Sequence, residues 1–234
     1  IADIGIPVSM GVEKRRTNIG VQVDKGVNGT IRYAILYKPQ ESINYTMSVN
    51  FRYGTAFYRN IGRSLNAYNQ ENISKNLTRY YDGGSPTALW AVRSRGIDPA
   101  TGQEIFVKKD GTLTYTFDYK DEVEVGDSRP TLEGVWGNTF YYKGWSASLQ
   151  LRYSFGADVF NSTLFNKVEN ISSRSITTNQ DRRALYNRWK KPGDKAKFKS
   201  ISLTESTPMS SRFVMKENDL SIESVRLGSV SYTH

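Results

Sequence analysis

Apolar and polar residues alternate along two stretches of the chain, residues 43–53 and 145–155. Successive side chains of a β-strand point to opposite sides, so each stretch predicts a strand with one apolar and one polar face. Each stretch covers 11 positions, whereas ordinary strands run for about five to six residues and a tilted strand that crosses a bilayer needs about nine to eleven. The apolar positions are Ile43, Tyr45, Met47, Val49, Phe51 and Tyr53 in the first stretch, and Trp145, Ala147, Leu149, Leu151, Tyr153 and Phe155 in the second.

Weaker patterns predict partner strands around these two. Strands at residues 17–24 and 30–37 are expected to pair through a hairpin turn at residues 25–29. Further strands are expected at residues 134–142 and 221–232. Short turns at residues 38–42 and 143–144 lead into the two strong strands.

Two other connections are much longer, at about residues 54–131 and 156–219. Short turns at one rim and long loops at the other are typical of outer-membrane barrels. The first connection is expected to fold, because Asp110-Gly111 favours a hairpin of residues 103–108 and 112–119. The second is expected to contain a helix over residues 179–189, which Pro192 and Gly193 would end.

The predicted fold class is therefore all-β: part of a large antiparallel transmembrane β-barrel with long, partly folded extracellular loops. The aromatic content, with 15 Tyr, 10 Phe and 4 Trp, agrees with the aromatic girdles of such barrels. The alternation alone also fits a soluble β-sandwich in which each sheet has one buried and one wet face. In that alternative the chain would be a cell-surface glycan-binding protein.

Composition excludes several kinds of chemistry. The chain has no cysteine, and its one histidine is the last residue, His234. A Ser-His-Asp triad, a multi-histidine metal site and a Cys-ligated zinc are therefore not expected, and we predict no enzyme, no catalytic residues, no cofactor and no metal. The net charge of +9 permits a nucleic-acid partner, but no nucleic-acid-binding module is visible and none is predicted. The acidic run at residues 118–127 could bind calcium, although it lacks EF-hand spacing.

An ordered set of segments resembles the SusC/RagA-like TonB-dependent outer-membrane transporters. The order and spacing match over about residues 16–232. The segments are GIDPATG at 96–102 followed by Gly111-Thr112, GDSRPTLEG at 126–134, YKGW at 142–145, WKKPGD at 189–194, and SRFV at 211–214 followed by residues 220–227.

This resemblance implies import of a bulky nutrient, a glycan or a peptide, across the outer membrane of a Gram-negative, Bacteroidetes-type bacterium. It implies a SusD-like surface lipoprotein as partner, TonB acting through an N-terminal part that this sequence lacks, the rest of the same barrel, and the lipid bilayer. The family's plug domain and first barrel strands are also absent. We therefore interpret residues 1–234 as an incomplete C-terminal portion of the barrel.

Candidate site residues follow from this interpretation. Arg52 and Arg152 lie on the polar sides of the two strong strands and are expected to face the lumen. Five residues of the long connections are candidates for contact with substrate or partner, because interfaces favour aromatic and arginine anchors. They are Arg79, Asp82, Trp90, Arg93 and Trp189. The alternative for the aromatic members is packing within a folded loop.

Overall fold

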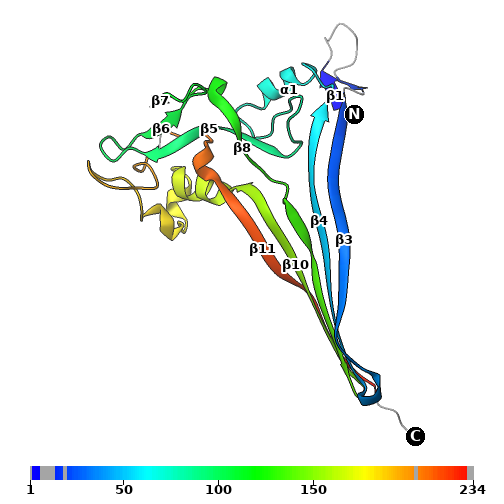
Figure 1. Cartoon of the computed structure of the whole chain (residues 1–234). Helices are drawn as coiled ribbons and strands as arrows, with labels where there is room; N and C mark the ends of the chain where they lie inside the picture. Colours follow the sequence, from blue (N-terminus) through cyan, green and yellow to red (C-terminus); the bar gives the residue numbers. More distant parts are fainter. Residues whose placement is uncertain (1, 6–13, 18–19, 203–204, 231–234) are drawn as a thin grey trace. The chain divides into compact units, whose positions relative to one another are not determined.

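The computed structural model describes residues 2–5, 14–17, 20–202 and 205–230 (Figure 1). The chain divides into two units. The strand unit comprises residues 23–57, 129–157 and 216–234, and the loop unit comprises residues 1–22, 58–128 and 158–215. The two units are described separately below.

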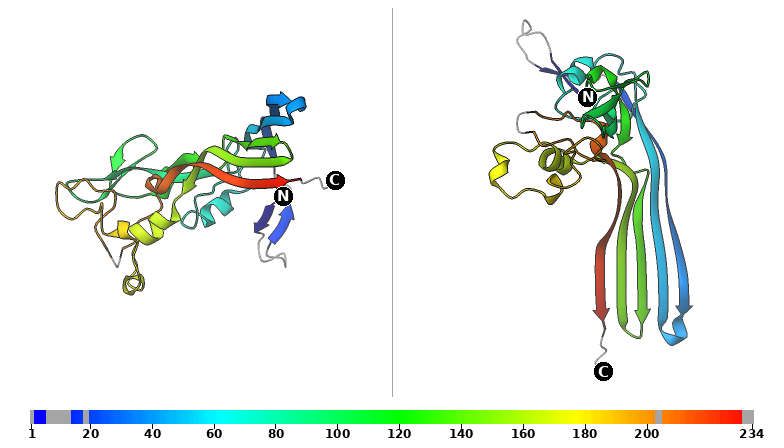
Figure 2. Two further views of the ribbon diagram at one scale, coloured as in Figure 1. Left: turned by 90° about the horizontal axis from the view of Figure 1, so that it is seen from below. Right: turned by 90° about the vertical axis from the view of Figure 1, so that its left-hand side faces the viewer.

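The strand unit contains one sheet of five long strands, in the order β11-β10-β9-β4-β3. Figure 2 shows these strands side by side. Four of them have 16 to 18 residues, about three times the usual length. The strands are β3 (Val21–Lys38), β4 (Ile43–Arg59), β9 (Leu132–Tyr142), β10 (Trp145–Phe160) and β11 (Val214–Ser229). The strands expected from the alternating stretches are confirmed, and they extend further than the pattern indicated.

The hairpin expected at residues 25–29 is wrong, because β3 runs without interruption through this segment. The glycines of this segment allow β3 and β4 to approach each other closely, and they do not form a turn. A Cβ atom at Gly26 would lie 3.0 Å from the Cα of Gly54 on β4, and Thr30 donates a hydrogen bond of 2.8 Å to Asn50 on β4. A glycine inside a strand often marks such a close approach of two backbones.

The register of β4, β9 and β10 places most apolar side chains on one face and most polar side chains on the other, with Asn138 and Val135 as exceptions. Val49 pairs with Trp136, and Trp136 pairs with Leu151. One position along, Asn50 pairs with Val135, and Val135 pairs with Arg152. Because directly paired residues share a face of the sheet, the two predicted faces continue across three strands.

Both short turns lie at one end of the sheet. Tyr142 pairs with Ile43 and with Trp145, and the turns reverse through residues with positive φ, Ser42 at 54° and Lys143 at 44°. At the opposite end Leu132 pairs with Tyr53 and Phe155. The long connections of β4 to β9 and of β10 to β11 therefore leave the sheet at the end opposite the turns.

A second sheet, ordered β7-β6-β5-β8, forms the centre of the loop unit. The hairpin expected about Asp110-Gly111 is confirmed as β6 and β7, although β7 has only two residues. The strands of this second sheet are β5 (Ala88–Ile97), β6 (Glu104–Val107), β7 (Leu113–Thr114) and β8 (Glu122–Asp127). A separate pair of strands consists of β1 (Ala2–Gly5) and β2 (Lys14–Thr17). The described helices are α1 (Asn66–Glu71), the π-helix η4 (Leu164–Glu169) and the 3₁₀ turns η2 (Pro39–Glu41), η3 (Tyr119–Asp121), η5 (Ser175–Thr177), η6 (Arg182–Ala184) and η7 (Ser211–Phe213). Within the described residues, no helix is long and apolar enough to cross a membrane.

The helix expected over residues 179–189 is wrong. The structure has a single 3₁₀ turn, η6, that begins where the Asp181 carboxylate accepts a hydrogen bond from the Arg183 backbone at 2.9 Å. The carbonyl of Ala184 accepts a hydrogen bond from the guanidinium of Arg188, whereas in an α-helix it would accept from the Arg188 backbone. Asn187 has a φ of 58°, which ends any right-handed helix at that point.

A buried ion cluster joins the two long connections inside the loop unit. The Arg212 guanidinium donates to Glu104 at 2.9 Å and to Glu169 at 2.9 and 3.1 Å. The two glutamate side chains are 1% and 0% exposed. Ser210 donates a further bond of 2.6 Å to Glu104, and Thr207 donates one of 3.0 Å to Glu169. Both buried carboxylates are thus paired and hydrogen-bonded, as burial of charge requires.

We expect Arg212→Met to destabilise the loop unit severely. The substitution leaves two buried carboxylates without a cation, and breaking a buried ion pair in this way costs about 3–5 kcal/mol. The measurement is urea unfolding of the purified protein followed by tryptophan fluorescence. The control is Arg183→Met, which removes an exposed ion pair with Asp181 and should cost less than about 1 kcal/mol. Equal losses in both variants would contradict the role given to the cluster.

Candidate functional site

The apolar face of the strand unit has no protein cover among the described residues. Gly29 packs against the ring of Phe51, so alternate residues of β3 share the face of Phe51. These residues include Ile31, Tyr33 and Tyr37, which are 62%, 63% and 70% exposed. Contiguous apolar surface of this extent marks contact with a membrane or a partner.

The opposite, polar face carries arginines in exposed ion pairs. Arg52 lies 3.5 Å from Glu133, and Arg152 lies 2.6 Å from Glu223. The side chains of Arg52 and Glu133 are 59% and 44% exposed. Exposed ion pairs contribute only about 0–1 kcal/mol, so Arg52 can exchange Glu133 for another anionic partner at little cost.

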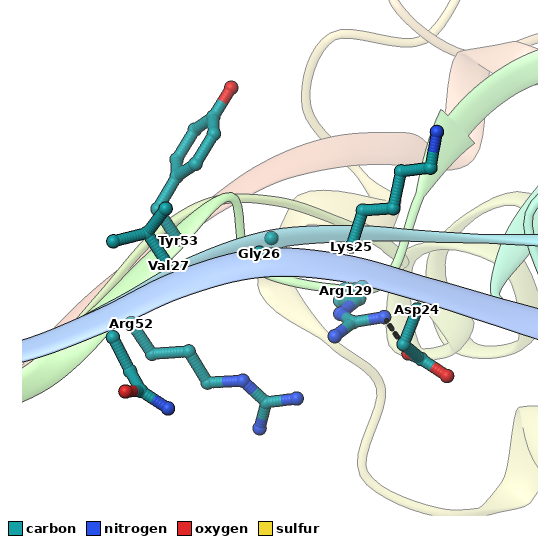
Figure 3. Close-up of a pocket in the computed structure, with 9 residues that line it drawn as sticks. Asp24, Lys25, Gly26, Val27, Arg52, Tyr53 and Arg129 are labelled. Atoms are coloured by element: carbon teal, nitrogen blue, oxygen red, sulfur yellow. Dashed lines mark hydrogen bonds and ion pairs between the residues drawn. The ribbon is translucent and has the colours of Figure 1, made fainter.

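Arg52 also borders a notch in the polar face, shown in Figure 3. Gly26 and Gly54 place no side chain there, which leaves a cavity of about 180 Å³. Asp24 and Arg129 form an ion pair of 3.0 Å at the same notch. In Figure 3, Lys25, Val27 and Tyr53 project to the other side of the strands, as strand alternation requires.

The notch can receive a small polar or anionic group, and its size excludes a larger ligand. Pockets for small molecules usually measure about 300–1,000 Å³. Arg52 is paired with the exposed Glu133, whereas Arg129 is paired with Asp24 inside the notch. The notch is therefore a contact point on a larger polar face, and that face is the candidate functional surface of the strand unit.

Of the candidates in the first connection, Arg79 is a structural residue of the loop unit. Its guanidinium is buried and binds Glu122 through two bonds of 2.9 and 3.0 Å. Its other N–H groups donate to the backbone carbonyls of Ile73, Asn76 and Thr78 at 2.8 to 2.9 Å. Burial raises the pKa of Glu122, and the hydrogen bonds from Arg79 oppose that rise. A guanidinium engaged in this way has no donor to offer a ligand.

Asp82 and Arg93 have different surroundings. The Asp82 carboxylate accepts hydrogen bonds from the backbones of Ile61 and Gly62 at 2.9 and 3.0 Å, so it holds the turn that follows β4. Arg93 lies on β5 opposite Val107, and its side chain is exposed. Arg93 is therefore the better placed of the two for contact with a partner.

The two candidate tryptophans are not brought together. Trp189 donates a hydrogen bond of 2.9 Å to the carbonyl of Pro99, and its ring fills the space beside Gly102. Trp90, on β5, lies against Tyr81 with ring centroids 4.7 Å apart. Its indole Nε1 is buried and has no acceptor in the described part of the chain.

The acidic run at residues 118–127 is dispersed among several contacts. Asp118 begins η3 by accepting from the Lys120 backbone at 2.9 Å, and Glu122 binds Arg79. Asp127 accepts a 2.6 Å bond from Thr87. The described residues contain no group of three carboxylate or histidine side chains that could hold a metal ion.

Sequence patterns did not identify the glycine notch or the neighbours of Trp90. Gly26 was interpreted as part of a turn, and Arg129 was treated only as part of a family segment. A glycine in each of two strands that pair in the sheet was the available signal, but it becomes informative only when the register is known.

Comparison with known proteins was made at the level of sequence and of structure. No protein-family model matches the chain, and no curated protein matches it. A chain from the structure of the RagAB peptide transporter has a TM-score of 0.77 at 18% identity, over 96% of this chain and 24% of that one. Chains of the RagAB peptide importer in the open-open and closed-closed states give TM-scores of 0.75 and 0.73 at 18% and 19% identity, over 97% and 96% of this chain and 24% and 25% of theirs.

This chain therefore spans about a quarter of the length of the solved chains that it matches. The likeness extends over nearly the whole of this chain and concerns its fold. The predicted fold class, all-β with antiparallel sheets, is confirmed, and the fold is similar to that of one part of the RagAB transporter chains.

Proposed function

We propose that this chain forms part of the wall of a TonB-dependent outer-membrane transporter of the SusC/RagA-like kind, in a Gram-negative, Bacteroidetes-type bacterium. The observation that carries the proposal is the single-layer sheet of the strand unit. Its long strands keep an uncovered apolar face apart from a polar face that bears Arg52 and Arg152. In a transmembrane barrel, lipid covers the first face and the lumen contacts the second.

The rest of the same barrel is the first partner of the strand unit. β3 and β11 are the outer strands of the five-stranded sheet. In lipid, unpaired backbone groups at a sheet edge cost several kcal/mol each. Further strands of the barrel would pair with both edges, so we propose residues 1–234 as an incomplete C-terminal portion of the transporter. Its long loops lie at about residues 54–131 and 156–219.

The loop unit is proposed to lie outside the cell and to contact a SusD-like lipoprotein. Both long connections leave the sheet at the end opposite its short turns, and barrels of this kind have their long loops outside. Binding functions are commonly carried by loops on a rigid scaffold. TonB would act through the part of the transporter outside this sequence. The nutrient is a peptide or a glycan. The similarity in fold to the RagAB peptide transporter favours a peptide.

We expect charge on the apolar face to block barrel assembly. Val49→Arg and Leu149→Arg would place a guanidinium against lipid, which costs about 2–4 kcal/mol near the bilayer midplane. Ser48→Arg and Ser148→Arg are matched controls on the polar face. Heat-modifiable mobility of the outer-membrane fraction on gels measures assembly. Equal losses on both faces would favour the soluble sandwich instead.

Cysteine labelling tests the sidedness, since the chain has no native cysteine. Thr116 and Lys195 are exposed in the loop unit, and Gln40 is exposed in the turn between β3 and β4. Thr116→Cys and Lys195→Cys should react with a membrane-impermeant maleimide on intact cells after deletion of the lipoprotein. Gln40→Cys should react only after the outer membrane is opened. Reaction of Gln40→Cys on intact cells, with the other two silent, would invert the topology.

A further inference from the structure

The apolar face of the strand unit is bordered at each end by a row of paired apolar side chains. We call the border at the short turns the turn row and the opposite border the loop row. The turn row consists of Ile43, Tyr142 and Trp145, and the loop row consists of Tyr53, Leu132 and Phe155. Both rows contain aromatic rings, and Tyr and Trp are enriched where a membrane meets water.

The separation of the two rows matches the thickness of a membrane. On β4 the rows are reached at Ile43 and at Tyr53. A strand rises by about 3.4 Å per residue, so the rows lie about 34 Å apart along β4. Barrel strands tilt by about 35–45°, which reduces this length to a height of about 24–28 Å, and the apolar band of such barrels is about 25 Å tall. The rows therefore correspond to the two borders of the hydrocarbon layer.

Charged side chains are absent from the apolar face between these rows, in the described residues of β3, β4, β9 and β10. Gly26 on β3 lies against the backbone of Tyr53 and Gly54, which places it level with the loop row. The next residue outward is Lys25, and Figure 3 shows its side chain on the same side of the strands as Val27 and Tyr53. Lys25 is therefore a cation on the apolar face just beyond the loop row.

The ammonium of Lys25 is held at this level and is not neutralised by a neighbouring acid. Its Nζ lies 5.4 Å from the centroid of the Phe57 ring, and an aromatic face attracts a cation. The side chain is exposed and forms no ion pair with the described residues. The adjacent Asp24 points to the opposite face, where it binds Arg129.

The other border has a similar arrangement. The Nζ of Lys143 lies 5.3 Å from the centroid of the Tyr142 ring, which belongs to the turn row. A lysine at a membrane border lays its apolar stem along the apolar surface while its ammonium reaches the level of the lipid headgroups. Each border of the face therefore carries a lysine over an aromatic ring.

We propose that Lys25 binds the phosphate of a phosphorylated glycolipid in the outer leaflet of the surrounding membrane. Its ammonium is a compact charge with three donors, which suits a phosphate group. This inference rests on the proposed function, because it requires the apolar face to lie in an outer membrane with the loop row toward the outside.

The surroundings of Lys25 favour a lipid over an acidic protein surface. One cation adjoins Phe57, Val27 and Tyr53, so the site combines a single charge with a continuous apolar wall. A lipid matches both parts at once, because its acyl chains cover the apolar wall while its phosphate meets the ammonium. An acidic protein surface would bring several carboxylates against a face that offers them one cation.

The test is lipid binding to the purified full-length transporter in a non-ionic detergent, followed by native mass spectrometry. The probe is lipid A that carries phosphate, compared with dephosphorylated lipid A and with inorganic phosphate. We expect Lys25→Gln to weaken binding of the phosphorylated lipid about fivefold, which corresponds to about 1 kcal/mol, the contribution of one lysine near an anionic lipid. The matched control is Lys38→Gln on the same strand, where Lys38 is paired with Glu41 at 3.2 Å, and it should bind normally.

Three results would overturn the phosphate site. The first is equal binding of lipid A with and without phosphate by the unaltered transporter. The second is unchanged affinity of Lys25→Gln for the phosphorylated lipid. The third is binding of inorganic phosphate alone with the same dependence on Lys25, which would identify a free anion as the ligand.

A spin label separates failure of this site from failure of the transporter proposal. Ile31 lies on the apolar face of β3 between the two rows, and Ile31→Cys supplies a single labelling site because the chain has no native cysteine. In vesicles, this label should be reached by oxygen and shielded from a water-soluble nickel complex. A label that the nickel complex reaches would remove the membrane wall and the phosphate site together. A shielded label with unchanged lipid binding by Lys25→Gln would remove the phosphate site alone.

Discussion

In a sheet only one layer thick, each face must suit a different environment, and the backbone groups of both edge strands need hydrogen-bond partners. The rest of this structure depends on that constraint. The alternation from β4 through β9 to β10 keeps apolar side chains on one face, where the polar Asn138 accepts a hydrogen bond from Tyr45. Each strand must then keep its register, because a shift by one residue would exchange the faces. The tight turns at Ser42 and Lys143 fix the register where the strands reverse.

The loop unit is held by a different interaction, since its apolar core is small and assembled from distant segments. Val92, Val168 and Phe213 are among its few fully buried apolar side chains. Arg212 adds a polar centre that binds β6 and η4 at once. Displacing β6 or η4 would leave a buried carboxylate without Arg212, so the cluster favours the observed arrangement of these two elements.

The sequence predicted those features that have a local period and missed those that depend on a partner. Alternation over residues 43–53 and 145–155 was sufficient for β4 and β10, and Asp110-Gly111 for the β6–β7 hairpin. The continuity of β3 was missed because Gly26 pairs with a strand whose register was unknown. The helix over residues 179–189 was predicted from composition, but the side chain of Arg188 takes the carbonyl that the helix needs. Trp90 was identified as a candidate, but the contact of its ring with Tyr81 is known only from the folded loop.

The ion cluster also imposes an order on folding. Ser210 and Arg212 reach Glu104 across 106 and 108 positions of the chain, whereas β9 and β10 are joined by a two-residue turn. Closing a long loop costs entropy before its contacts contribute any energy. The β9–β10 hairpin can therefore form early, and the loop unit can close only when nearly the whole chain has emerged. A chain cut short before Arg212 would keep its hairpins and the Arg79–Glu122 pair, but it could not join its two long connections through the ion cluster.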